Sequence, residues 1–146
     1  MGGSYLVRPE ERNRRITILR GVFWFGAVAD GLIAIEWYLI SLGLVDISVH
    51  PSFFVGEGPS FRYAMSIGAM FMMGWAALLY WGSRSPLERS GLLLITGVLL
   101  LLATISDYIV FGSMFTLGQT LLGSAVKLSL AAIFLASFIY SARIRE

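Results

Sequence analysis

Four long apolar runs constrain this chain more than any other feature. They cover roughly residues 16–44, 61–81, 87–111 and 117–141. A helix needs about 20 apolar residues to cross a bilayer, and each run meets that length. The sequence therefore predicts an all-α integral membrane protein, a single domain over residues 1–146, with four transmembrane helices in an up-down bundle.

Composition supports a membrane environment and removes several kinds of chemistry. The 146 residues are 57% hydrophobic and 14% charged, unlike a typical soluble domain. The chain has no cysteine, which excludes disulfides, thiolate metal sites and thiol catalysis. Its single histidine, His50, precedes a proline in a predicted loop. We therefore expect no metal site, no cofactor and no catalytic residue.

Basic residues predict the orientation of the helices. Nine of the eleven fall on one side of a four-span arrangement, and only Arg62 falls on the other. Cytoplasmic loops are enriched in Lys and Arg, so both termini are predicted to be cytoplasmic. Beside a span, an arginine-rich N-terminus indicates topology and contact with anionic lipid rather than nucleic-acid binding. The protein would be multi-pass, in the plasma membrane if the chain is prokaryotic.

Helix-start signals precede several runs. Pro9 with Glu10 and Glu11 is typical of a first helical turn that continues into the first span. Ser85-Pro86-Leu87-Glu88 and Thr116-Leu117-Gly118-Gln119 are typical capping boxes for spans three and four. A cleaved signal peptide is the alternative for the first run, but Arg20 interrupts it and apolar residues continue past Asp30, which favours a retained span.

Four ionisable residues, Asp30, Glu36, Asp107 and Lys127, lie within the apolar zone of the runs, where lipid disfavours charge. In the first, Asp30 and Glu36 lie about 60° to either side of Ile33, so both carboxyls can face the bundle interior. Asp107 and Lys127 lie near a short connection, and a lysine stem leaning outward would reach the acid. We predict an Asp107–Lys127 ion pair, with Arg62 a candidate partner of Glu36.

Within the apolar zone the three acids outnumber the single lysine even if Arg62 reaches in, so at least one acid would need a proton, a cation or water. A structural clasp between helices is the alternative for any of these charges. The candidate binding set consists of Asp30, Glu36, Arg62, Asp107 and Lys127, with Trp37 and Tyr38 as possible lining. We favour a structural role for the Asp107–Lys127 pair and a functional one for Asp30 and Glu36.

Three functions remain open from the sequence. The leading hypothesis is binding or transport of a proton, a cation or an amphipathic cationic molecule in an acidic pocket of the outer half. The second is an accessory subunit of a larger membrane complex, or a homodimer, docking through small residues such as Ala125, Ser129, Ala132 and Ala136. The third is a membrane-embedded lipid-modifying enzyme, which the absence of catalytic motifs disfavours.

Overall fold

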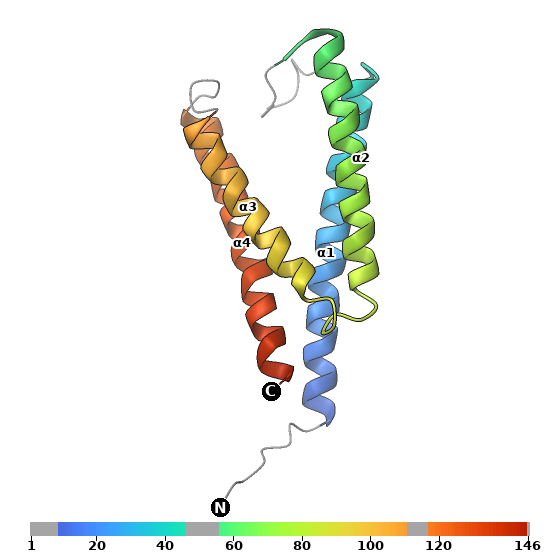
Figure 1. Cartoon of the computed structure of the whole chain (residues 1–146), viewed down its shortest axis with the longest axis vertical. Coiled ribbons are helices and arrows are strands. Elements are labelled where there is room, and N and C mark those ends of the chain that lie inside the picture. Colours follow the sequence, from blue (N-terminus) through green and yellow to red (C-terminus); the bar gives the residue numbers. More distant parts are fainter. Residues whose placement is uncertain (1–8, 46–55, 111–116, 146) are drawn as a thin grey trace, which may run out of the picture.

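The computed structural model describes residues 9–45, 56–110 and 117–145, and within these ranges the chain is helical apart from short connections (Figure 1). The helices are α1 (Pro9–Ser41), α2 (Gly58–Gly82), α3 (Gly91–Ile109) and α4 (Leu117–Arg145). All four are long and apolar enough to cross a membrane. Only 22–28% of the most apolar window of each helix is buried, so most of the apolar surface is left for lipid.

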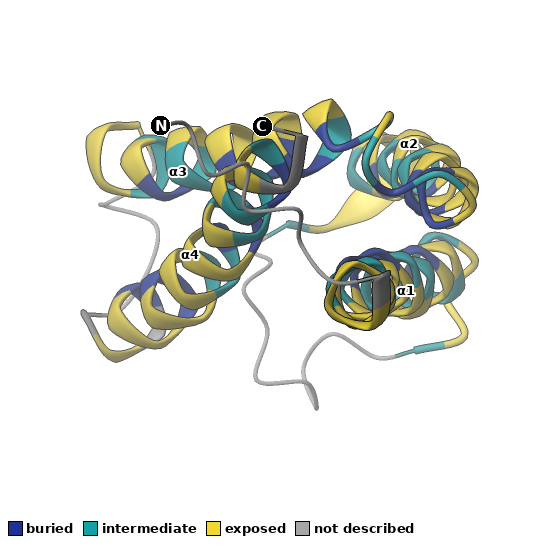
Figure 2. Ribbon diagram, turned by 90° about the horizontal axis from the view of Figure 1, so that it is seen from below, coloured by how far each residue is buried: buried dark blue, intermediate teal, exposed yellow. Residues whose placement is uncertain are grey.

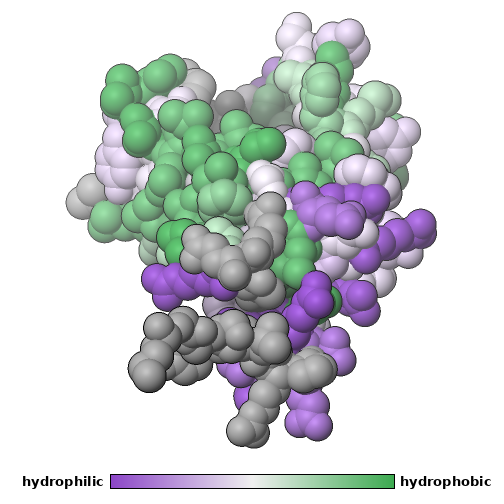
Figure 3. All heavy atoms as spheres, turned by 60° about the horizontal axis from the view of Figure 1, so that its bottom comes forward, coloured by the Kyte–Doolittle hydropathy of each residue, from purple (hydrophilic) through white to green (hydrophobic). Residues whose placement is uncertain are grey.

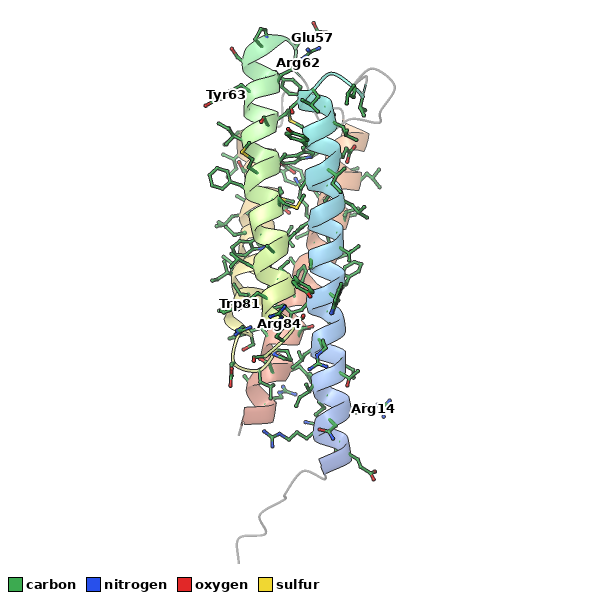
Figure 4. All side chains as sticks on the ribbon, turned by 90° about the vertical axis from the view of Figure 1, so that its right-hand side faces the viewer. Arg14, Glu57, Arg62, Tyr63, Trp81 and Arg84 are labelled. Carbon is green, nitrogen blue, oxygen red and sulfur yellow. The ribbon has the colours of Figure 1, made fainter. Side chains whose placement is uncertain are left out.

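The helices pack as two antiparallel hairpins, α1 with α2 and α3 with α4 (Figure 2). In the first hairpin, α1 from Phe23 onward runs antiparallel to α2 and keeps a constant register along the length of α2 (Figure 4). The contacts that show this register are Phe23 with Gly82, Gly26 with Leu79, Gly31 with Ala76, Trp37 with Gly68, and Gly43 with Arg62. In the second hairpin, Gly97 lies against Leu135 and Asp107 against Lys127.

The two hairpins meet at one end only. A buried cluster of Leu19, Phe23, Leu79, Leu93 and Phe134 joins all four helices near the connection between α2 and α3. From this cluster the hairpins diverge toward the opposite end of the molecule (Figure 1). The molecule therefore has one closely packed end and one end where the pairs stand apart.

The predicted helix start at Pro9 is confirmed, but α1 ends at Ser41, three residues earlier than the predicted span. Gly43 takes a positive φ of 72°, a conformation that favours glycine. The Gly43 N–H donates to the Ile40 carbonyl and the Leu44 N–H donates to the Leu39 carbonyl, the two bonds of a Schellman motif. This glycine turn ends the helix before the apolar run is finished.

Two helix starts also differ from the predicted ones. Helix α2 begins at Gly58 rather than Phe61, because Pro59 fits the first turn, where its missing N–H is not needed. Helix α3 begins at Gly91, four residues later than predicted from Ser85-Pro86-Leu87-Glu88. Residues 85–90 form isolated turns instead, including a bond from the Arg89 N–H to the Ser85 carbonyl.

The Arg89 side chain contacts the end of α2. Its guanidinium carbon lies 3.4 Å from the centre of the Trp81 ring, and its Nη1 donates to the Trp81 carbonyl. The connection is thereby tied to the end of α2 before α3 begins. Helix α4 begins at Leu117 as predicted and continues past the predicted end at Ser141 to Arg145. His50 and the capping residue Thr116 lie outside the described residues.

Candidate functional site

Asp30 lies on the face of α1 that is turned into the molecule. It is within about 40° of Phe23, Gly26 and Trp37 around the helix axis. Phe23 and Trp37 contact α2, while Gly26 contacts both Leu79 of α2 and Phe134 of α4. Asp30 follows Gly26 by one turn, in the direction in which the hairpins diverge. Its carboxyl is therefore placed where the close packing of the four helices ends.

The carboxyl group of Asp30 is partly buried. In the described part of the chain it makes no hydrogen bond and no ion pair with another side chain. A carboxylate removed from water without a partner carries a large desolvation cost. This position within an apolar helix makes Asp30 the most unusual charge in the described structure.

The predicted ion pair between Asp107 and Lys127 is confirmed. The Lys127 ammonium donates to Oδ2 of Asp107, with 19% of the acid side chain and 32% of the lysine side chain exposed. Lys127 lies about 20° around α4 from Phe134, which contacts α1. The pair therefore lies on a side of the second hairpin that is turned toward the first, and its two charges neutralise each other.

Glu36 and Arg62 occupy places different from that of Asp30. Glu36 is half-buried and lies about 120° around α1 from Asp30, roughly 9 Å further along the axis. The Arg62 guanidinium lies against Gly43, within about 3.1 Å of the position that a Cβ would occupy there. Arg62 thus lies beside the C-terminal end of α1, where a positive charge is favourable, about two turns beyond Glu36.

Trp37 and Tyr38 point to different surroundings. The Trp37 ring packs directly over Gly68 of α2. Tyr38 is 47% exposed and lines a shallow hollow of about 210 Å³ between α1 and α2. The other residues of the hollow are apolar: Ala34, Ile35, Leu39, Ala69, Met70 and Met73. Neither Asp30 nor Glu36 lines it, so it is a separate feature from the acidic positions.

Several polar contacts were not anticipated from the sequence. The Trp75 indole donates to the Thr96 hydroxyl at 3.2 Å and links α2 to α3 across the two hairpins. Nε of Arg20 donates to the Ser83 carbonyl at 3.2 Å, next to the end of α2. Thr96, a polar residue inside an apolar run, was a signal in the sequence for its contact with Trp75. The second depends on the register of α1 against α2, which the sequence does not contain.

Among the described residues, no group of three or more His, Cys, Asp or Glu side chains could hold a metal ion. Comparison of the chain with protein-family models, with curated proteins and with solved structures finds no match.

Proposed function

We propose that this protein binds a cation at Asp30, between its two helical hairpins, within the membrane. The ligand class is a proton or an amphipathic organic cation, whose apolar part would contact the surrounding apolar side chains. The observation that carries the proposal is the inward-facing carboxyl of Asp30, which has no partner in the described chain. The Asp107–Lys127 pair, by contrast, is already neutral.

The proposed orientation is an up-down bundle with both termini in the cytoplasm. On the face seen in Figure 3, hydrophilic residues gather at the lower end of the molecule and hydrophobic ones lie above them. The lower end holds the N-terminal part of α1, which carries Arg12, Arg14 and Arg20, and the α2–α3 connection, which carries Arg84. The positive-inside rule favours the cytoplasm for that end. Asp30 would then lie near the bilayer midplane, and the diverging ends of the hairpins would face outward.

A binding experiment with a lipophilic cation tests the proposal. We would measure equilibrium binding of radiolabelled tetraphenylphosphonium to the purified protein in nanodiscs of phosphatidylcholine. Asp30→Asn should weaken binding at least about tenfold, because the phosphonium cation loses its counter-charge. Lowering the pH should also weaken wild-type binding, since protons compete for the same carboxylate.

Glu88→Gln is the matched control, because it removes an acid that is exposed outside the helices. It should leave binding unchanged. If Asp30→Asn binds the cation as tightly as the wild type, or if Glu88→Gln weakens binding equally, a site at Asp30 is ruled out.

A second candidate function is that of a subunit in a larger membrane assembly. Ala125, Ser129, Ala132 and Ala136 form an exposed strip on α4, on the side away from Phe134. Small residues let two helices approach closely in a membrane. Cross-linking in native membranes would support this function if a defined partner, or a second copy, is captured through the strip and lost in an Ala132→Leu variant.

A further inference from the structure

Two arginines flank the end of α2 on the outer surface of the first hairpin. Nε of Arg20 donates to the Ser83 carbonyl, and Arg84 is the next residue of the chain. An arginine carries five N–H donors, so Arg20 retains its two terminal NH₂ groups for another ligand. The Arg84 guanidinium makes no hydrogen bond in the described part of the chain. The two side chains thus bring unused, charged donors to one place.

Two aromatic rings adjoin these arginines. The guanidinium carbon of Arg84 lies 5.6 Å from the centre of the Tyr80 ring. Tyr80 in turn makes an edge-to-face contact with Trp24 of α1, with ring centres 5.1 Å apart. Both rings are nearly half exposed, at 43% and 47%. Amphipathic aromatic side chains are enriched at the headgroup level of membranes, so we expect this cluster to lie at the membrane–water interface.

Above the rings, the surface between α1 and α2 is shallow and apolar. Gly31 faces Ala76, and a Cβ added at Gly31 would lie 4.0 Å from the Ala76 Cβ, so no large side chain fills the seam. Trp24, Gly31, Ile35 and Tyr38 lie within about 60° of one another around α1. The seam therefore continues from the aromatic rings toward the apolar hollow that Ile35 and Tyr38 line.

We propose that this surface binds one anionic phospholipid of the cytoplasmic leaflet. Arg20 and Arg84 would contact the headgroup phosphate, for which guanidinium groups offer paired donors. Trp24 and Tyr80 would lie at the level of the glycerol, and an acyl chain would follow the seam past Gly31. The hydrocarbon part of one leaflet is about 15 Å thick, which equals the rise of about ten helical residues. An acyl chain of a lipid whose headgroup is bound at Arg20 therefore reaches the level of Asp30 and Gly31. The inference is independent of cation binding at Asp30.

Thermal unfolding in detergent tests this lipid site. The Tm would be measured with added phosphatidylglycerol and with added phosphatidylcholine, and each variant would be compared with its own phosphatidylcholine value. For the wild type, phosphatidylglycerol should raise the Tm by roughly 4 °C or more, because a ligand of the folded state stabilises it. The Arg20→Gln/Arg84→Gln variant should lose most of this shift.

Arg12→Gln/Arg14→Gln is the matched control, since it removes the same charge from two exposed arginines near the start of α1. It should keep the shift. Equal loss in both double variants would mean general attraction to anionic lipid and would overturn the site. Free glycerol 3-phosphate should have no effect; a shift equal to that of phosphatidylglycerol would overturn the assignment to lipid. Native mass spectrometry of the folded variants, counting bound phosphatidylglycerol, keeps the test decisive if removal of Arg20 weakens the fold.

Discussion

At the scale of single residues, the intramembrane charges divide by whether a partner lies within reach. Asp107 and Lys127 meet because the register of α3 against α4 places them opposite one another near a short connection. Asp30 lies on a helix whose neighbour at that level, α2, offers apolar side chains. The same residue type is thus neutralised in one hairpin and left without a partner in the other.

Removing one member of the Asp107–Lys127 pair should destabilise the protein by about 2 kcal/mol, because the remaining charge stays partly buried without compensation. Lys127→Met and Asp107→Leu are the single variants, and unfolding in mixed detergent and SDS micelles measures their free energies.

The Asp107→Leu/Lys127→Met double variant should lose less stability than either single variant, since no unpaired charge remains. A double variant whose loss equals the sum of the two single losses would show that the two charges do not interact.

Asp30→Asn should raise the free energy of unfolding at neutral pH by about 1 kcal/mol, because it removes a desolvated carboxylate that has no partner. The same micelle unfolding experiment measures this, with Glu88→Gln as an exposed control of near-zero effect. A loss of stability after Asp30→Asn would indicate that the carboxyl holds helices together, and would favour the accessory-subunit function.

At the scale of helices, glycines decide how closely each pair packs. Large side chains of one helix lie directly over glycines of the other, as with Phe23 over Gly82 and Trp37 over Gly68. Close approach of small residues is the usual source of helix association in lipid, where the hydrophobic effect between helices is absent. Glycines that face open space, such as Gly74, do not take part in this packing.

Gly82→Ala should destabilise the protein by about 1–3 kcal/mol. The new methyl would overlap Cε1 of Phe23, a ring that is fully buried. Gly74→Ala, on the same helix, should be neutral or slightly stabilising, because no atom lies within 4 Å and alanine favours the helix. Thermal unfolding of both variants in one detergent compares them; equal effects would contradict this packing.

At the scale of the whole molecule, the orientation in the membrane can be tested by labelling at two exposed acids that lie at opposite ends of α2. Glu57 precedes α2 and Glu88 lies in the α2–α3 connection. The chain has no cysteine, so a single introduced cysteine is labelled without background. In intact bacterial spheroplasts, a membrane-impermeant maleimide should label Glu57→Cys but label Glu88→Cys only after lysis. The reverse pattern would contradict cytoplasmic termini.

The sequence by itself determined the four helices of the described chain and that each is long and apolar enough to span a membrane, because about 20 consecutive apolar residues are sufficient for both inferences. It also indicated the Asp107–Lys127 pair, since a short connection restricts the register of two neighbouring helices. The end of α1 and the start of α3 were less predictable: a Schellman turn at Gly43 ends α1 within the apolar run, and Arg89 stacks on Trp81 before α3 begins.

Only the tertiary structure decided which residues share a site. Helical periodicity places Asp30 and Glu36 on one broad face, but cannot say which part of that face another helix covers. That depends on contacts between residues far apart in the chain, such as Gly26 with Phe134 and Arg20 with Ser83. These contacts arise from side-chain shape and helix register, so the separation of the hairpins beside Asp30 and the arginine cluster at α2 emerged only once the helices were assembled.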